Sequence, residues 1–235
     1  MPLESRHLTP ADYRVMPWKN GQGTTTEIAA FPPGAGLDSF TWRISIADIT
    51  SSGPFSSFPG IDRILLQTAG EPMTLVHQDD AFPTACRLTL LSPVRFPGER
   101  VIHGDVPTPP VRDFNVMTRR DRALASVAVH QLAPGSTVRT QGPATARILH
   151  ALQGSLSIRL TPTAPTAPTA PTAPTTILTL SEGETWLLTA TLEDDTSFEL
   201  SSPSPSSSLT PAVAIAITVT EWSPAASPAA SPAVD

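Results

Sequence analysis

The stretch TWRISIAD, residues 41–48, decides the fold class of this chain. Successive side chains of a β-strand point to opposite faces of its sheet. Counted from one residue earlier, one face carries Phe40, Trp42, Ile44 and Ile46, and the other carries Thr41, Arg43, Ser45 and Ala47. This alternation of apolar and polar faces predicts a strand rather than a helix.

Seven further stretches are equally short and rich in β-branched and apolar residues, namely 62–69, 73–77, 86–91, 125–132, 145–152, 184–190 and 212–222. Turn residues such as Pro134-Gly135 and Gln153-Gly154 separate them. Short strands at regular spacing predict an all-β sandwich or barrel. The one helical signal is Thr9-Pro10, which predicts a single turn with Thr as N-cap and Pro at the first helical position.

Two parts of the chain share a similar sequence pattern. Residues 65–80 and residues 149–160 both run strand, glycine turn, strand, about 84 positions apart. Two similar halves favour a duplicated β-barrel over one open sandwich.

Composition excludes several classes of function. The 235 residues carry a net charge of −6, and only 15% of them are charged, without a basic run that could follow a phosphate backbone. The single cysteine, Cys86, cannot form an intrachain disulfide or a cysteine-based zinc site. The N-terminus does not resemble a signal peptide, and no segment has the apolar length of a membrane span. We therefore expect a cytoplasmic protein with no nucleic-acid or membrane partner.

Proline is concentrated in three stretches, residues 162–174, 201–211 and 223–235. The first is a Pro-Thr-Ala repeat between two alternating runs, 155–160 and 176–180, which predicts a hairpin with an expanded loop. Neutral expansion of a surface loop and a docking segment for a partner are both compatible with this repeat.

The most unusual stretch is residues 15–29, VMPWKNGQGTTTEIA. It holds Trp18, Asn20, Thr24 and the only lysine of the chain, Lys19, in a loop broken by glycine. A lysine ammonium suits a carboxylate or phosphate ligand. The alternative is that a bias toward arginine left one lysine by chance.

Two arginines have open roles. If Arg43 and Ser45 face a barrel interior, that interior can hold an anion, because a guanidinium binds a carboxylate through two hydrogen bonds. If the Trp42 face lines the interior, Arg43 is a solvated charge. Similarly, Phe58 and Arg63 lie either in a packed loop or at a barrel mouth.

Residues 112–120, RDFNVMTRR, place Asp113, Asn115, Met117 and Arg119 on one face of a strand. Buried polar groups of this kind need partners. They either satisfy one another or line a wet pocket.

Signals for catalysis or metal binding are weak. The five histidines show no metal-ligand spacing. Cys86 lies in an apolar strand, where an inert thiol is the usual state. We therefore expect no metal, no cofactor and no catalytic residue. An enzyme would have to use Asp113 or Asp62 as its base.

The segments 17–21, 24–28, 40–47, 53–63 and 113–120, in this order, resemble the HutD/Ves family. The resemblance implies a cupin-type fold (a double-stranded β-helix or RmlC-like jelly roll) with two β-barrel halves, a bicupin. The implied halves are residues 1–132 and 133–222, with a repeat loop at 161–175 and a disordered tail at 223–235.

The resemblance also implies a function. The family is associated with histidine utilisation, so the chain is expected to bind a small anionic metabolite such as formylglutamate and to act as a regulator of that pathway, without catalysis. The alternative is a metal-independent cupin enzyme acting on a small carboxylate. A homodimer is compatible with either. The implied ligand-binding residues are Trp18, Lys19, Asn20, Thr24, Trp42, Arg43, Ser45, Phe58, Arg63, Asn115, Met117 and Arg119.

Overall fold

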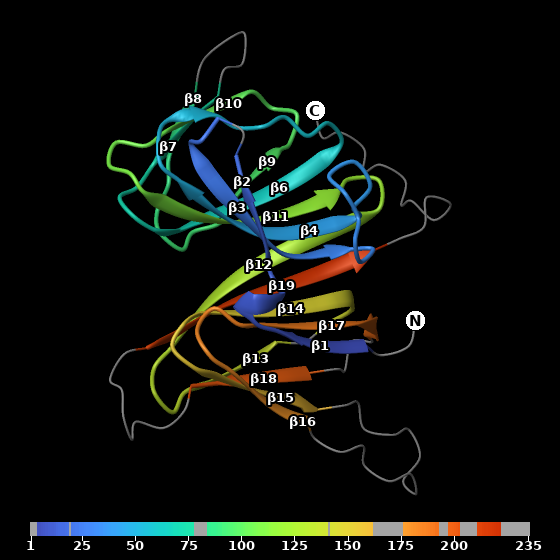
Figure 1. Cartoon of the computed structure of the whole chain (residues 1–235). Coiled ribbons are helices and arrows are strands. Elements are labelled where there is room, and N and C mark those ends of the chain that lie inside the picture. The colour runs from blue at the N-terminus through green and yellow to red at the C-terminus, as the bar shows by residue number, and fades with distance from the viewer. Residues whose placement is uncertain are drawn as a thin grey trace, which may run out of the picture.

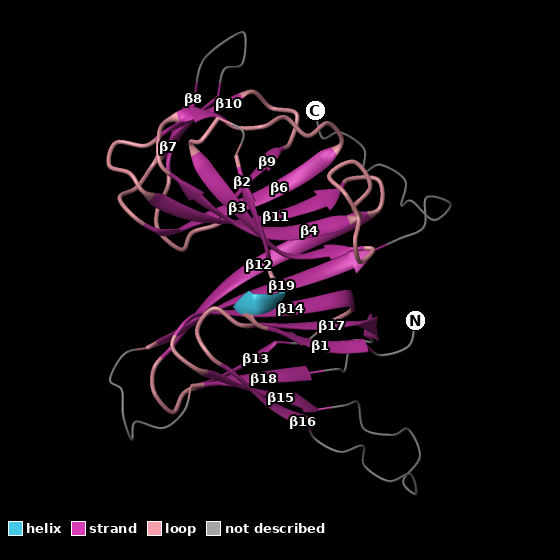
Figure 2. Cartoon of the chain, viewed as in Figure 1, coloured by secondary structure: helices cyan, strands magenta, loops and turns pink. Residues whose placement is uncertain are grey.

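The computed structural model describes residues 4–18, 20–77, 84–140, 142–161, 176–192, 197–202 and 211–221. Within these ranges the chain forms strands and one short 3-10 helix, η1 (Pro10–Asp12), which begins after Thr9 as predicted (Figure 2). The strands form four sheets that stack as four layers (Figure 1). The Thr-Ala-Pro repeat and the tail predicted to be disordered lie outside the described residues.

Two layers form what we call the first unit. Its inner sheet has the order β2-β3-β4-β11-β6-β9, and its outer sheet has the order β5-β10-β7-β8. The bounds of the inner strands are β2 Arg14–Pro17, β3 Gly23–Phe31, β4 Trp42–Ile49, β11 Val111–Arg119, β6 Ile61–Ala69 and β9 Val94–Pro97. The outer strands are β5 Gly53–Pro54, β10 Ile102–Asp105, β7 Thr74–His77 and β8 Thr84–Arg87.

The other two layers form the second unit. Its inner sheet has the order β1-β17-β14-β19-β12, and its outer sheet has the order β13-β18-β15-β16. The inner strands are β1 Glu4–Leu8, β17 Thr185–Leu192, β14 Ala144–Gln153, β19 Ala212–Glu221 and β12 Ala123–Leu132. The outer strands are β13 Thr137–Thr140, β18 Ser197–Ser201, β15 Leu156–Thr161 and β16 Thr176–Leu180. Strands β1 and β12 precede residue 133 but pair into this second unit.

Alternation along each strand decides which interface a side chain fills. The two inner sheets pack face to face through Trp42, Ile44 and Phe114 of the first unit and Ile148 and Ile217 of the second, all nearly inaccessible to solvent. Burying a large apolar side chain stabilises the fold by about 1.5–3 kcal/mol. The opposite faces of the inner sheets pack against the outer sheets of their own units. Each unit therefore has its own interior.

The strands differ from the sequence prediction in three ways. Strand β8 ends at Arg87 rather than near residue 91, because Leu88 and Leu91 donate backbone hydrogen bonds to Met73 and Gln67 and leave the ladder. Strands β1, β2, β3, β5, β9, β10, β13 and β18 were not predicted. The sheets also remain open layers and do not close into the predicted pair of barrels. The predicted hairpin is present, since β15 and β16 pair with Leu156 opposite Leu180.

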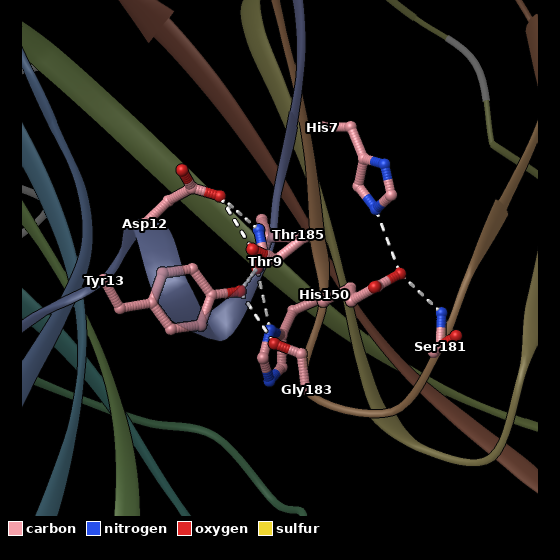
Figure 3. A network of polar contacts seen from close by, with 9 residues as sticks. His7, Thr9, Asp12, Tyr13, His150, Ser181, Gly183 and Thr185 are labelled. Carbon is pink, nitrogen blue, oxygen red and sulfur yellow. Dashed lines mark hydrogen bonds and ion pairs between the residues drawn. The ribbon is translucent and has the colours of Figure 1, made fainter.

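A polar network fastens the N-terminal segment to the second unit (Figure 3). The hydroxyl of Tyr13 donates to the carbonyl of Gly183 at 2.7 Å and lies 2.7 Å from the hydroxyl of Thr185. The same Thr185 hydroxyl is 2.9 Å from Nδ1 of His150, which is buried between the two inner sheets. These bonds hold the start of the chain against β14 and β17.

Candidate functional site

A cavity of about 530 Å³ lies inside the first unit, between its inner and outer sheets. Strands β4, β6 and β11 supply its floor, the segments around residues 17–25 and 51–58 supply its walls, and β10 approaches from the outer sheet. A cavity of this size accommodates a small metabolite. The lining carries polar and charged groups from the three central strands, which gives it a chemistry distinct from the surrounding apolar core.

Strand β4 resolves one open alternative. Arg43 and Ser45 line the cavity, whereas Trp42 and Ile44 point to the other face and pack between the two inner sheets. The side chain of Trp42 is fully buried there and donates from Nε1 to Glu221 of β19 at 2.8 Å. The arginine face is therefore the interior face.

Strand β11 contributes three inward side chains, Asp113, Asn115 and Met117. The amide nitrogen of Asn115 donates to Asp113 Oδ1 at 3.2 Å. The amide oxygen of Asn115 accepts from Arg63 Nη2 at 3.2 Å and from Nε at 3.3 Å. Both interpretations of this strand hold together, because these groups satisfy one another and also line the cavity.

The two arginines of the cavity differ in their charge balance. Arg43 Nε forms an ion pair with Glu27 Oε2 at 2.6 Å. Arg63 is bonded to the amide oxygen of Asn115 and the carbonyl of Ser56, so in the described part of the chain no carboxylate touches its guanidinium. Burial lowers the pKa of Arg63 to about 10, which leaves it charged at neutral pH.

Aromatic rings fix the position of Arg63. Its guanidinium carbon lies 5.3, 5.8 and 5.1 Å from the ring centroids of Phe55, Phe58 and Phe96. Rings at this distance attract a cation and orient it. Arg63 does not pair with its neighbour Asp62, which instead accepts from Arg120 at 2.7 Å outside the cavity.

Burial raises the pKa of Asp113 to about 7, and Arg63 opposes that shift. The carboxyl group is almost completely inaccessible to solvent, at 1% exposure. Asp113 therefore exchanges its proton near neutral pH. When it is protonated, the cavity carries one negative charge less and attracts anions more strongly.

Backbone geometry at the cavity wall depends on two glycines. Gly21 has a φ of 70°, which residues other than glycine rarely adopt. A Cβ at Gly23 would lie 2.5 Å from the carbonyl oxygen of Asp48 and 3.1 Å from the ring of Trp18. The indole of Trp18 lines the cavity and donates to Thr25 at 2.8 Å. The glycines thus let this segment approach β4 closely.

The structure brings most of the sequence-predicted site residues together. Those that line the cavity are Trp18, Asn20, Arg43, Ser45, Phe58, Arg63, Asn115 and Met117. Trp42 belongs to the core between the inner sheets, and Thr24 is not part of the cavity lining, although its neighbour Thr25 is. Arg119 holds the carbonyls of Phe40 and Asp38 at the strand end. Lys19 lies outside the described residues.

Sequence reasoning missed the roles of Glu27, Phe55 and Phe96 in this site. Glu27 pairs with Ser45 across β3 and β4, so it faces the same side as Arg43. The run of three threonines within residues 23–31 shows no clear alternation, so neither this strand nor the orientation of Glu27 was predicted. Phe96 carried no such signal, because its contact with Arg63 depends on the pairing of β6 with β9. In the described ranges, no three His, Cys, Asp or Glu side chains converge as metal ligands would.

Comparisons with known proteins agree on one family. The sequence profile of the HutD family matches residues 10–198. The chain is similar to Protein Ves of Cronobacter sakazakii, with 35% identity over 160 residues that cover 64% of this chain and 81% of that protein. No helix of the described residues is long and apolar enough to cross a membrane.

Two solved structures share the fold. A conserved protein of unknown function from Pseudomonas aeruginosa PAO1 has a TM-score of 0.74 and 30% identity, and the match covers 92% of this chain and 99% of that one. HutD from Pseudomonas fluorescens SBW25 has a TM-score of 0.70 and 24% identity, covering 94% and 100%. The all-β fold is cupin-like.

Proposed function

The chain belongs to the HutD family, and from this premise we propose that it binds a small acidic metabolite in the cavity of the first unit. We propose a dicarboxylate of the formylglutamate type, whose capture moderates histidine catabolism in the cytoplasm. The protein acts as a binding protein rather than as an enzyme. The link to histidine catabolism rests on the family resemblance, and the acidic character of the ligand rests on the cavity.

One observation carries the proposal: Arg63 is 6% exposed and faces the cavity without a carboxylate on its guanidinium. A buried guanidinium that contacts no carboxylate is costly to bury, and an anionic ligand that contacts it reduces that cost. Asp113 acts on Arg63 only through space. Arg43 is the second cation of the lining, and Ser45 and Asn115 offer neutral hydrogen-bonding groups. Trp18 and Phe58 supply apolar surface for the carbon chain of the ligand.

We also infer that the two units are the two halves of a bicupin. The pairing of β6 with β11 in the first unit has a counterpart in the pairing of β14 with β19 in the second. Each unit places an outer four-stranded sheet over one face of its inner sheet. A duplication of one unit accounts for both correspondences.

Thermal unfolding with N-formylglutamate tests the proposed function. A ligand that binds only the folded state at 100 times its Kd adds about 2.7 kcal/mol of stability. Arg63→Gln should remove this gain. Arg112→Gln is the matched control, because Arg112 lies on β11 but pairs with Asp48 at the surface, with its side chain 52% exposed. An equal gain in both variants, or no gain in the wild type, contradicts the proposal.

A second function, catalysis on a small carboxylate, is favoured by Asp113. It is the acidic side chain of the cavity whose pKa, about 7, suits a general base. Asp62, the other candidate, is engaged by Arg120 outside the cavity. Turnover of N-formylglutamate, followed by NMR and lost in Asp113→Asn, would establish catalysis. An unchanged substrate spectrum at high protein concentration would favour binding alone.

A further inference from the structure

The second unit has a cavity of its own. It has a volume of about 360 Å³ and lies between the inner and outer sheets of that unit. The buried Arg147 of β14 and the half-buried His130 of β12 supply polar groups, and Phe198 of β18 covers the cavity from the outer sheet. Arg139 lies at its rim, 73% exposed and paired with Glu199.

The position of this cavity repeats that of the first. Arg63 and Arg147 are 84 residues apart, as are the positive-φ glycines Gly70 and Gly154 that end their strands. Arg63 lies on β6 and pairs across to β11, and Arg147 lies on β14 and pairs across to β19. Both guanidiniums stack on aromatic rings, since Arg147 Cζ is 5.2 Å from the centroid of Phe198. The two arginines therefore occupy equivalent places.

The surroundings of the two arginines differ in charge. On β11, Arg63 pairs with Met117. Asn115 and Asp113 lie two and four residues before Met117, and both line the first cavity. On β19, Arg147 pairs with Thr218. The residues two and four positions before Thr218 are Ala216 and Ala214. The second cavity thus keeps the buried cation and replaces the amide and carboxyl groups by methyl groups.

Among the residues that the structure describes, two buried atoms of the second cavity have no hydrogen-bond partner. Arg147, 5% exposed, donates from Nη1 to Thr218 at 3.2 Å and from Nη2 to the carbonyl of Gly142. Its Nε, and Nε2 of His130, are buried without a partner in the described part of the chain. Groups of this kind are rare in folded proteins, because each costs about 1–3 kcal/mol when left unsatisfied.

We propose that the second cavity binds a small monocarboxylate with an apolar tail. One guanidinium balances one negative charge, and its free Nε–H can donate to a carboxylate oxygen. His130 Nε2, on β12 two strands away from β14, offers a second hydrogen-bonding atom of the lining. Leu149, Ala216 and the ring of Phe198 offer apolar surface to the carbon chain of the ligand, and three hydroxyl groups complete the lining. Arg139 is balanced by Glu199 and does not serve as the anchor.

The test uses sodium butyrate, with neutral butyramide as the matched control, added to the full chain. Binding is followed by the NMR signals of the His130 ring, which report on the second cavity alone. Butyrate should shift these signals in a saturable way and butyramide should not. Arg147→Gln should weaken butyrate binding roughly ten-fold to hundred-fold, as expected for loss of a hydrogen bond to a charged group. Arg63→Gln should leave the response of His130 unchanged.

Ala216→Asp keeps Arg147 and places a carboxylate near it within the cavity. This variant therefore tests whether the charge of Arg147 binds butyrate, even if Arg147→Gln does not fold. We expect it to abolish the butyrate response. The proposal is overturned if butyrate leaves the His130 signals of the wild type unchanged, if butyramide shifts them equally, or if Ala216→Asp binds butyrate as the wild type does.

Discussion

Acidification should destabilise this protein through one buried histidine, His150. The residue is 2% exposed, and its ring centroid lies 5.3 Å from that of Phe114 across the boundary between the two inner sheets. The network in Figure 3 also fixes its proton. Tyr13 uses its only hydrogen on the carbonyl of Gly183, so Thr185 must donate to Tyr13, and His150 Nδ1 must donate to Thr185. His150 therefore carries a proton on Nδ1, and its lowered pKa leaves the ring neutral at pH 7.

Burial lowers the pKa of His150 from 6.5 to about 4. The unfolded chain takes up a proton near pH 6.5, whereas the folded chain takes it up only near pH 4. The stability contributed by this group is thus complete above pH 6.5 and is lost as the pH falls. The full loss is about 3 kcal/mol, and about 2 kcal/mol of it should appear between pH 7 and pH 5.

Urea unfolding of the wild type and of His150→Asn at pH 7 and pH 5 measures this effect. The variant keeps an N–H donor near Nδ1 but cannot titrate. Asp113 moves stability in the opposite direction, because its raised pKa favours folding as it protonates, but it is present in both proteins and cancels in the comparison. The advantage of wild type over variant should shrink by about 2 kcal/mol at pH 5. A constant difference, or a His150 ring that titrates near pH 6.5 by NMR, would refute the reasoning.

Three further substitutions, one of them with a matched glycine control, probe the core and the first cavity. Gly70→Ala should cost about 2–4 kcal/mol in urea unfolding, because φ is +87° and the new Cβ would lie 2.6 Å from a carbonyl oxygen; Gly34→Ala, with φ of +80° and open space, should cost only about 1 kcal/mol. Trp42→Phe should cost about 1–3 kcal/mol in the same assay, since it leaves a half-buried glutamate of β19 unbonded. Glu27→Gln should strengthen N-formylglutamate binding roughly ten-fold by calorimetry, because it frees the charge of Arg43. Equal costs at the two glycines, an unchanged unfolding midpoint in the tryptophan variant, or weaker binding in the glutamine variant would contradict these expectations.

The sequence alone was sufficient for the all-β class and for most central strands. Alternation along residues 41–48 and 145–152 predicts β4 and β14 within one or two residues, because successive side chains of a strand point to opposite faces and the two faces carry different groups. The same local logic predicted the turn at Thr9 and the hairpin of β15 with β16. It failed for β3, whose run of threonines is polar on both faces, and for the end of β8.

The candidate site could be predicted only in part from the sequence, and the rest required the tertiary structure. Residue types and their order placed Arg43, Ser45 and Asn115 in a family resemblance, but alternation could not say which face of a strand is enclosed. That choice depends on what covers each face. The outer sheet covers the arginine face and the second unit covers the tryptophan face.

By itself, then, the chain's sequence determined most of the central strands, their two-residue period and the chemical groups on each face, because these depend on neighbours along the backbone. The tertiary structure alone decided that Arg63 meets three aromatic rings, and that Arg147 pairs with Thr218 on a strand whose next inward side chains are those of alanines rather than an amide and an acid. Those contacts join strands far apart in the chain, so their charge balance is set by the pairing and stacking of sheets and not by any local pattern.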